Sequence, residues 1–344
     1  MSTAVTLKKT DANIALHDIK VVSLPRPVLK ANQALLRIDA AALNHRELWI
    51  LKNMYPGIKF DSVLGADAVG RITELNGESG HFKVGDRVVV MPSQGWTSSL
   101  RGPEVESEYF IRGGTESPGI FTQLFAADQA EIFKAPAYLT DIEAAALPLA
   151  GLTAYRTVFT KGQVVKGQNV LITGIGGGVA LFALQYAVAV GANVYVTSSD
   201  DSKIERAIQL GAKGGANYRK ENWEEQLLKA SNGQQIDVVI DGASGPGADT
   251  ILSKVLVLGG IFVTYGQTAG DFKFNIMHIL RNIEVRGSTM GSRAEFEKML
   301  EFVEKHQIRP IVSQVFEGLE KVSEAVECMK NGVQFGKMVV TVQH

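Results

Sequence analysis

Val170-Leu-Ile-Thr-Gly174-Ile-Gly176-Gly177-Gly178-Val179-Ala180 is the stretch that decides the fold of this 344-residue sequence. Its apolar beginning, 170–173, predicts a short buried strand of a parallel sheet, and the apolar run 179–190 predicts a helix that is buried on several sides. A strand, a glycine turn and a helix in this order are typical of dinucleotide-binding folds, because glycine permits the tight turn and leaves helix N–H groups free to hold a pyrophosphate. The alternative is a glycine-rich turn without a ligand. The candidate cofactor-binding residues of the turn are Gly174, Gly176, Gly177, Gly178 and Val179.

The chain downstream of this turn alternates between strands and helices. Strands are expected at 193–197, 236–241 and 260–265, and helices at 178–190, 201–210 and 246–257. This alternation predicts an α/β fold with a doubly wound parallel sheet. Two further helices, at 294–305 and 319–331, and a last strand at 337–342 are expected beyond it.

The N-terminal part is expected to be rich in β-structure. A strand at 34–42 leads into a single helical turn at 43–49, and a Gly-Asp turn at 85–86 precedes another strand. Residues 91–120 are rich in Gly, Pro, Ser and Glu and lack periodicity, which predicts a long surface loop. Thr140 and Glu143 have the spacing of a capping box ahead of an alanine-rich helix.

The composition excludes several classes of protein. The 35 Lys and Arg residues nearly balance the 36 Asp and Glu residues, so no net charge favours binding to nucleic acid or to an anionic membrane. Cys328 is the only cysteine, which excludes a disulfide within the chain and a cysteine-rich zinc lobe. The N-terminus has no apolar core of signal-peptide length, and no apolar run is long enough to span a membrane. We therefore expect a soluble, cytoplasmic protein.

Six stretches, in the same order along the chain, resemble the medium-chain dehydrogenase/reductase superfamily. They are residues 42–47, 64–70, 84–88 and 144–155, the glycine turn, and residues 335–340. The nearest resemblance is to the zinc-free quinone-oxidoreductase branch, whose less characterised members are called zinc-type alcohol dehydrogenase-like. It implies a GroES-like, β-rich catalytic domain at 1–130, completed by 289–344, and a Rossmann cofactor-binding domain at 131–288.

Zinc-dependent relatives supply a cysteine after the first catalytic-domain strand, a Gly-His-Glu further on, and a cysteine or aspartate before the cofactor domain. The corresponding residues here are Asn44, Gly65-Ala66-Asp67 and Leu149-Ala150. Alanine and leucine cannot coordinate zinc, and a catalytic zinc requires about three protein ligands. His45 is the one further candidate, and a lone histidine is more often hydrogen-bonded or exposed to solvent. We therefore expect no zinc.

The choice of nicotinamide cofactor depends on the end of the second strand of the Rossmann domain. NAD-dependent domains carry an acidic residue there, which binds the ribose hydroxyls. The aligned residue here is Ser198, which is small and neutral. Similar reductases place a phosphate-binding lysine where Lys203 stands, although a solvated helix lysine is the alternative, and a tyrosine where Tyr218 stands. Ser198, Lys203 and Tyr218 together favour NADPH over NADH. Asp200 and Asp201 oppose this, because a small shift in register would place a carboxylate at the ribose, and the alternative for them is helix N-capping.

The resemblance also implies which residues lie around the nicotinamide. Asn44 is expected to bind an oxygen of the substrate or of the carboxamide, and Glu47 to order the first turn of its helix or to hold a neighbouring arginine. Tyr55 matches a tyrosine that lines the pocket of similar reductases, where it would donate to the substrate carbonyl. Thr153 resembles a residue near the carboxamide, and Lys337 would reach a cofactor phosphate. Packing alone is the alternative for Glu47, Tyr55 and Thr153.

Together these features imply an NADPH-dependent, zinc-independent oxidoreductase that transfers hydride to quinones or α,β-unsaturated carbonyl compounds. One alternative is an alcohol or aldehyde oxidoreductase, which is disfavoured because alkoxide formation in this superfamily relies on zinc. Another is a low-turnover, crystallin-like or RNA-binding nucleotide-binding protein, and the near-zero net charge is unfavourable to RNA. We expect a small carbonyl or quinone substrate, no nucleic acid, no membrane, and a homodimer as in related reductases, joined through the strand at 260–265.

Overall fold

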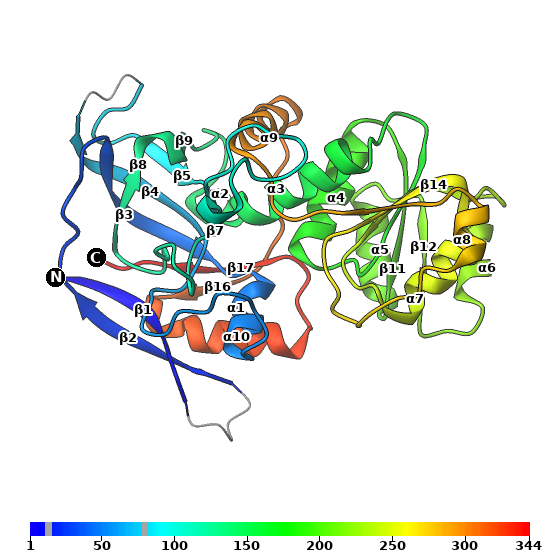
Figure 1. Ribbon diagram of the computed structural model, residues 1–344, viewed down its shortest axis with the longest axis horizontal. Helices are drawn as coiled ribbons and strands as arrows, with labels where there is room; N and C mark the ends of the chain where they lie inside the picture. The colour runs from blue at the N-terminus through cyan, green and yellow to red at the C-terminus, as the bar shows by residue number, and fades with distance from the viewer. Residues whose placement is uncertain (11–15, 78–80) are drawn as a thin grey trace. The chain divides into compact units, whose positions relative to one another are not determined.

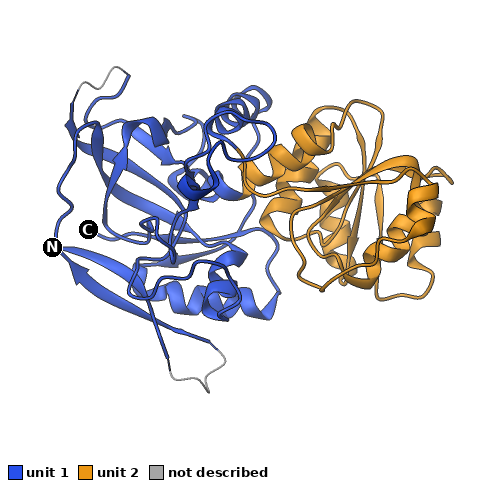
Figure 2. Cartoon of the chain, in the orientation of Figure 1, with its two compact units in different colours: residues 1–149, 292–344 blue, residues 150–291 orange. Residues whose placement is uncertain are grey.

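The computed structural model, which describes residues 1–10, 16–77 and 81–344, consists of two compact units (Figure 1). Unit 1 contains Met1–Leu149 and Ser292–His344, and unit 2 contains Ala150–Gly291 (Figure 2). The sequence places these divisions at 130/131 and 288/289. Residues 131–149 belong to unit 1 because β9 (Ile132–Lys134) pairs with β5 (Arg87–Val90) and α2 (Asp141–Ala146) packs against the same sheet. In the part of the chain that the structure describes, no helix is long and apolar enough to cross a membrane.

Unit 1 is built on a sheet with the strand order β16-β17-β3-β4-β5-β9, and β8 also pairs with β3. Its other strands are β3 (Gln33–Ala42), β4 (Asp67–Asn76), β8 (Leu124–Asp128), β16 (Val312–Glu317) and β17 (Lys337–Thr341). β3 is antiparallel to both neighbours, with Ala42 opposite Val339 of β17 and opposite Asp67 of β4. This register brings the beginnings of β4 and β17 next to the end of β3, although the three segments are far apart in the sequence.

Helices and two small hairpins complete unit 1. The helices besides α2 are α1 (His45–Leu51), α9 (Arg293–His306) and α10 (Val322–Asn331). The hairpins pair β1 (Ser2–Lys8) with β2 (Asp18–Leu24) and β6 (Ser93–Gln94) with β7 (Phe110–Ile111). Gln123 links the two chain ends, since its side chain accepts from the N–H of Thr3 at 2.8 Å and donates to the carbonyl oxygen of Gln343 at 2.7 Å.

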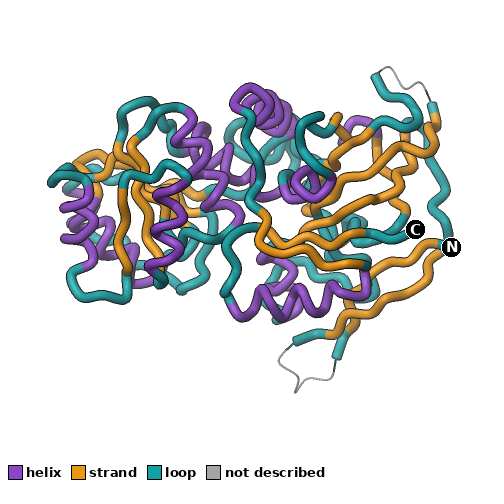
Figure 3. Tube along the Cα trace, turned by 180° about the vertical axis from the view of Figure 1, so that it is seen from behind, coloured by secondary structure: helices purple, strands orange, loops and turns teal. Residues whose placement is uncertain are grey.

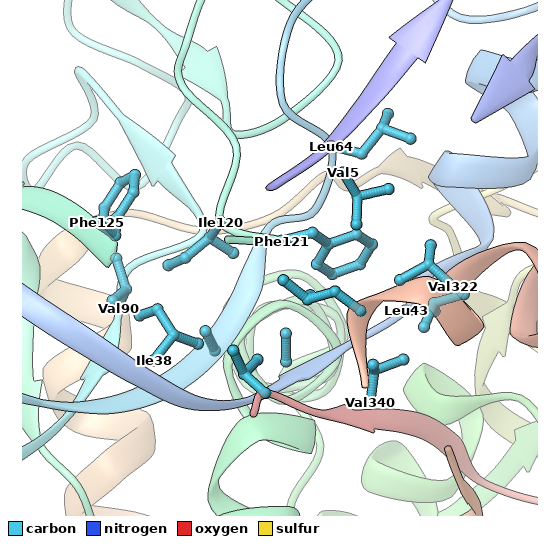
Figure 4. Packing of buried hydrophobic residues seen from close by; sticks show 14 of the residues in the cluster. Val5, Ile38, Leu43, Leu64, Val90, Ile120, Phe121, Phe125, Val322 and Val340 are labelled. Carbon is cyan, nitrogen blue, oxygen red and sulfur yellow. The ribbon is translucent and has the colours of Figure 1, made fainter. Parts of the chain in front are cut away.

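The hydrophobic core of unit 1 combines side chains from both ends of the chain (Figure 4). Four of these side chains are fully buried, namely Val5 of β1, Ile38 of β3, Phe121 and Val340 of β17. Val322 of α10 is 1% exposed. Burial of one such side chain contributes roughly 1.5–3 kcal/mol to stability. Because the N-terminal and C-terminal segments share this core, unit 1 requires both.

Residues 91–120 form the expected surface loop only in part. Of residues 112–120 at its end, all but Glu116 and Pro118 are buried. Arg112 is buried there and donates from Nε to the carbonyl oxygen of Met91 at 2.8 Å, and it forms an ion pair with Glu131. Gly113 has a φ of 80° and lies so close to the backbone of Gly65 that a Cβ would collide with it. The glycines of this segment therefore reflect close packing as well as exposed turns, which composition alone does not distinguish.

Unit 2 contains a parallel sheet with the strand order β12-β11-β10-β13-β14-β15, which confirms the doubly wound α/β fold. The strands are β10 (Asn169–Ile172), β11 (Asn193–Ser198), β12 (Gly214–Asn217), β13 (Ile236–Asp241), β14 (Leu256–Thr264) and β15 (Glu284–Gly287). The helices are α3 (Pro148–Tyr155), which leads into the unit, α4 (Gly178–Ala189), α5 (Asp201–Gln209), α6 (Trp223–Ala230), α7 (Gly245–Thr250) and α8 (Ile276–Leu280). Helices lie on both faces of the sheet (Figure 3). The strand order reverses between β10 and β13, and such sheets bind ligands outside the carboxyl ends of their strands at that point.

Parts of unit 2 differ from the sequence prediction. The helix expected at 246–257 is divided, since α7 ends at Thr250, a wider π-helical segment covers Ile251–Val255, and β14 begins at Leu256. The sequence also does not predict β12, α6 or β15. The two strands read Gly-Gly-Ala-Asn and Glu-Val-Arg-Gly, and Val285 is the only β-branched or aromatic residue in them, although such residues favour strands.

Candidate functional site

The glycine turn after β10 opens onto the N-terminus of α4. Gly174 and Gly176 have φ values of 61° and 122°, which other residues rarely adopt, and Gly177 is the N-cap of α4. A Cβ placed on Gly174 or Gly177 would meet no atom within 4 Å, so the space in front of the helix is open. Gly178 and Val179 form the beginning of the helix. These residues fit the pyrophosphate of a dinucleotide, which such a turn binds through its backbone N–H groups.

The residues expected at the adenosine ribose follow β11 and β12. Ser198 ends β11 and is 3% exposed, whereas Tyr218 follows β12 and is 47% exposed. A hydrogen bond of 3.1 Å from the N–H of Tyr218 to the carbonyl oxygen of Ser198 holds the two residues together. Lys203 lies on α5, where burial lowers the pKa of its ammonium and the charge of Asp200 acts against this. The structure therefore joins Ser198 to Tyr218 and places Lys203 on the helix that follows Ser198.

Asp200 and Asp201 act as structural groups of α5. The Asp200 carboxylate caps the helix by accepting from the N–H of Ser202 at 2.9 Å. Asp201 forms an ion pair with Lys220 at 2.9 Å and accepts from Nδ2 of Asn217 at 3.2 Å. Hydrogen bonds lower the pKa of both carboxyls, chiefly from Ser202 for Asp200 and from Lys220 for Asp201. Asp200 is thus the N-cap of α5, as in the alternative of helix capping.

Asp241 is a buried carboxylate that the sequence analysis does not single out. It ends β13 and accepts from Oγ1 of Thr173 at 2.6 Å and from the N–H of Ser244 at 2.7 Å. Burial raises the pKa of Asp241 against the effect of these hydrogen bonds. Because Thr173 directly follows β10, the pair links the two strands between which the sheet order reverses. The sequence signal that could have located this pair is a polar residue at the end of each of two apolar strands, Thr173 after β10 and Asp241 in β13.

A buried cluster of charged and amide groups lies where β3, β4 and β17 meet. Asp67 and Lys337 are 0% and 5% exposed, and Nζ of Lys337 lies 3.0 Å from Oδ2 of Asp67. Asn44 lies between them, because its Oδ1 accepts from Lys337 at 2.5 Å and its Nδ2 donates to Oδ2 of Asp67 at 2.9 Å. The other oxygen of Asp67 accepts from the N–H of Leu149 at 2.8 Å. Lys337, expected from the sequence at a cofactor phosphate, is thus paired with Asn44 and Asp67 inside unit 1.

Glu47 adjoins this cluster in the first turn of α1. Its Oε2 accepts from the N–H of Asn44 at 2.6 Å, and its Oε1 lies 3.2 Å from a guanidinium nitrogen of Arg46. Arg46 also donates to the carbonyl oxygens of Arg112 and Gly113. Burial raises the pKa of Glu47, and the charge of Arg46 opposes this shift. Glu47 therefore both orders the helix start and holds the arginine, the two roles expected for it.

Tyr55 and Thr153 have different surroundings. The guanidinium carbon of Arg46 lies 4.8 Å from the ring centre of Tyr55, which is half-buried and packs against the core of unit 1. Thr153 lies in α3, and its buried hydroxyl contacts the sulfur of Met290 at 3.9 Å within unit 2. Tyr55 is thus close to the arginine that Glu47 holds, whereas Thr153 belongs to the other unit.

The donor groups around Asn44 do not fit a catalytic zinc. Asn44 and Asp67 bind the ammonium of Lys337, and Leu149 contributes only its backbone. Zinc sites of this kind require about three nitrogen, sulfur or carboxylate ligands, and a buried cation among them opposes a second cation. Within the described ranges, no group of three His, Cys, Asp or Glu side chains is arranged to hold a metal ion.

Comparison with known proteins identifies two matching families and several similar proteins. Residues 30–137 match the alcohol dehydrogenase GroES-like domain, and residues 178–305 match the zinc-binding dehydrogenase family. A zinc-type alcohol dehydrogenase-like protein of Leptosphaeria maculans is 38% identical over 342 residues, which cover 94% of each chain. An acryloyl-coenzyme A reductase of Sulfurisphaera tokodaii is 27% identical over 329 residues, which cover 93% of this chain and 96% of the relative. The crystal structure of an NAD-dependent alcohol dehydrogenase matches with a TM-score of 0.88 at 29% identity, covering 100% of both chains.

Proposed function

The chain belongs to the medium-chain dehydrogenase/reductase superfamily of oxidoreductases, and we propose that it is a zinc-independent, NADPH-dependent reductase of quinones or α,β-unsaturated carbonyl compounds. The observation that carries the proposal is the cluster of Lys337, Asp67 and Asn44. Asn44 and Asp67 occupy sequence positions at which zinc-dependent relatives carry Cys and the Glu of Gly-His-Glu, and here they bind an ammonium ion. A bound nicotinamide cofactor supplies the hydride.

Without a metal ion, the charge that develops on the substrate oxygen decides which substrates are favoured. Reduction of an isolated carbonyl places almost a full negative charge on one oxygen. In a conjugated carbonyl or a quinone the charge is delocalised, so that neutral donors such as Tyr55 and Asn44 suffice. One such donor contributes about 3–4 kcal/mol at most to the transition state. The proposal therefore favours conjugated acceptors over saturated aldehydes.

The ribose end of unit 2 supports NADPH over NADH. Ser198 is small and neutral at the position where NAD-dependent domains carry an acidic residue. The nearby carboxylates of Asp200 and Asp201 are already engaged by a helix cap and by an ion pair. Lys203 and the neighbouring Arg206 supply positive charge, which a 2′-phosphate would bind through charge-assisted hydrogen bonds.

The relatives support an oxidoreductase and leave two classes of substrate to compare. The acryloyl-coenzyme A reductase acts, by its name, on a conjugated acyl group, which is the class proposed here. The NAD-dependent alcohol dehydrogenase supports the alternative of an alcohol or aldehyde oxidoreductase. A nucleotide-binding protein with low turnover is the remaining alternative.

Initial rates of NADPH oxidation test the proposal with three substrates at matched concentrations: a 2-alkenal, the saturated aldehyde of the same length, and a benzoquinone. We expect the enal or the quinone to be reduced at least about 100-fold faster than the saturated aldehyde, the rate factor of one oxyanion donor. Equal or faster reduction of the saturated aldehyde would favour the alcohol dehydrogenase alternative, and no turnover would favour the binding protein. Untagged protein should contain well under one zinc per chain, and a chelator should not lower its activity.

We also propose that two copies of the chain associate through the edge of the unit 2 sheet. The expected contact strand, 260–265, includes the end of β14, whose backbone is already paired on both sides, with β13 and with β15, so we place the contact at a neighbouring strand instead. β15 is the edge strand next to β14, and its outer backbone groups are available to another strand.

The side chains at this edge are suited to a second copy. Helix α8, which directly precedes β15, has four apolar side chains that are 56–68% exposed, namely Ile276, Met277, Ile279 and Leu280. In an antiparallel pairing of two β15 strands centred on Val285, Glu284 of each copy would lie opposite Arg286 of the other. Opposite charges in such cross-strand pairs are stabilising, so the strand is complementary to itself.

A further inference from the structure

Asn44 has hydrogen-bond partners of opposite kinds on its two sides. An ammonium group can only donate hydrogen bonds, and a carboxylate can only accept them. Nζ of Lys337 lies at Oδ1 of Asn44, and Oδ2 of Asp67 lies at Nδ2. Rotation of the amide by 180° would set its NH2 group against the ammonium and its carbonyl oxygen against the carboxylate, so both attractive contacts would become repulsive. The partners therefore fix the orientation of the Asn44 amide.

The two partners are themselves held in place. Asp67 begins β4 and Lys337 begins β17, and both strands pair with β3, whose end leads into Asn44. The second oxygen of Asp67 is bound by the N–H of Leu149. Both charged side chains are almost fully buried, and hydrogen bonds to charged groups are stronger than those between neutral groups. Loss of either partner would leave the other charge buried without compensation, which is strongly destabilising.

This arrangement leaves one N–H of the Asn44 amide without an acceptor among the described residues. The amide of Asn44 has two N–H groups, of which Asp67 accepts one, and in the described part of the chain the other has no acceptor. The Nε–H of Arg46, two residues further along, is a second buried donor without a partner among the described residues. A group that offers hydrogen-bond donors is complementary to an oxygen that gains negative charge.

We propose that Lys337 and Asp67 are positioning residues, and that the remaining N–H of Asn44 donates a hydrogen bond to the substrate oxygen that gains negative charge on reduction. The proposal rests on the reductase function proposed above. It specifies the acceptor as a carbonyl oxygen of an enal, enone or conjugated thioester, or as a quinone oxygen. It also assigns Lys337 to the amide of Asn44 in place of a cofactor phosphate.

Asn44→Asp tests the donor role with almost no change in shape. Burial and the like charge of Asp67 raise the pKa of the new carboxyl group, and the ammonium of Lys337, which is already paired with Asp67, opposes this shift only in part. The protonated form can accept from Lys337 and donate its single proton to Asp67, but it has no second donor. Because the pKa is raised in the folded state, the loss of stability should be small at about pH 5 and should grow as the pH rises to about 8.

We therefore expect the Tm of Asn44→Asp to approach that of the wild type at low pH, while kcat for a 2-alkenal stays about 100-fold lower at both pH values. Asn44→Ala is the matched variant without a titratable group, and its loss of Tm should not depend on pH. Recovery of kcat in parallel with Tm in Asn44→Asp would overturn the donor role, because it would show that the second N–H is not required.

The combined change of Lys337→Met and Asp67→Asn tests the positioning role without leaving a single buried charge. It allows the Asn44 amide to turn, so we expect kcat to fall while the Kd of NADPH is unchanged. An increase in this Kd of about tenfold or more would overturn the assignment and indicate that Lys337 binds a cofactor phosphate, since tenfold corresponds to about 1.4 kcal/mol.

Asparagine-selective ¹⁵N NMR separates a failure of this inference from a failure of the proposed function, because it requires no substrate. The side-chain amide protons of Asn44, identified by their loss in Asn44→Ala, should exchange with solvent much more slowly than those of exposed asparagines in the wild type. Rapid exchange of these protons in an active reductase would overturn the inference alone. Slow exchange in a protein that reduces none of the test substrates would overturn the reductase function and still support the fixed amide.

Discussion

Oε2 of Glu47 lies 2.6 Å from the backbone nitrogen of Asn44, and the Glu47 side chain is 1% exposed. The carboxyl group closes the first turn of α1 and so holds the backbone that carries the candidate catalytic asparagine. Burial raises the pKa of Glu47, and Arg46 only partly opposes this. The position of Asn44 therefore depends on a buried acid whose ionised form is disfavoured.

Glu47→Gln should lower the free energy of unfolding by roughly 1–3 kcal/mol at low pH, because the new NH2 group would face the guanidinium of Arg46. The raised pKa means that the contribution of Glu47 is complete below its unfolded pKa of about 4.3 and declines as the pH rises. The difference between wild type and variant should therefore shrink between about pH 4.5 and about pH 8. Urea unfolding at both pH values measures it, and a difference that grows with pH would contradict this account.

The sequence predicts the site better where a residue's place follows from its own strand. Asn44 and Glu47 come within five residues of the end of β3, so the local motif predicts where in the fold they lie. The pairing of Lys337 with Asp67 joins residues 270 positions apart and depends on how β17 and β4 align on β3, which no local pattern encodes. Asp241 was missed for a related reason, since its partner Thr173 belongs to another strand.

The fold shows the same division between local and long-range information. The apolar strands β10, β11 and β13 were predicted because a buried parallel strand is a continuous apolar run. The edge strands β12 and β15 were missed because an edge position does not require apolar residues on both faces. The first division between the units lies later than expected because the pairing of β9 with β5, and not composition, joins the segment at 131–149 to unit 1.

Lys203→Ala should weaken NADPH binding about ten- to a hundredfold and leave NADH binding almost unchanged. Loss of one charge-assisted contact to the 2′-phosphate costs roughly 1.5–3 kcal/mol, which corresponds to this range. Fluorescence titration with both cofactors measures the two Kd values. Lys229→Ala, an exposed lysine of α6, is the matched control and should change neither. Equal affinities of the wild type for the two cofactors would contradict the proposed preference for NADPH.

Tyr55→Phe should lower kcat for a conjugated carbonyl by about ten- to a thousandfold, the effect of removing one oxyanion donor. The ring that packs against Arg46 is retained, so the Kd of NADPH and the Tm should change little. Tyr138→Phe is a control with the reverse effect, and it should lower the Tm and leave kcat unchanged. The reason is that the Tyr138 hydroxyl donates to the carbonyl oxygens of Val303 and Ile308. If Tyr55→Phe keeps the wild-type kcat, the Tyr55 hydroxyl does not donate to the substrate and the side chain serves only in packing.

Glu104→Ala should loosen the loop at 97–104 without a change in kcat. The Glu104 carboxylate accepts from the N–H groups of Ser98, Thr97 and Ser99, and these bonds lower its pKa to about 2. Because the folded-state pKa is lowered, the wild-type loop should keep this support down to about pH 4 and lose it only as the pH approaches 2. Hydrogen exchange of a peptide that contains these amides, at neutral pH, should be faster in the variant. Unchanged exchange would mean that other contacts fix the loop.

Charge reversal at β15 tests both the association of two copies and its register. Arg286→Glu alone would set glutamates opposite each other on both sides of Val285 and should shift sedimentation toward the monomer, because like charges in cross-strand pairs are destabilising. Adding Glu284→Arg restores opposite charges and should restore the dimer. Both variants lose the bond from Arg286 to the carbonyl oxygen of Lys161, but the opposite-charge pair of residues 284 and 286 inside each chain is absent only from the single variant. An equal Tm of the two variants at a concentration at which both are monomeric is therefore needed to assign their difference to the dimer. A wild type that stays monomeric at all concentrations would contradict the dimer, whereas a dimeric wild type with a monomeric double variant would contradict only the register centred on Val285.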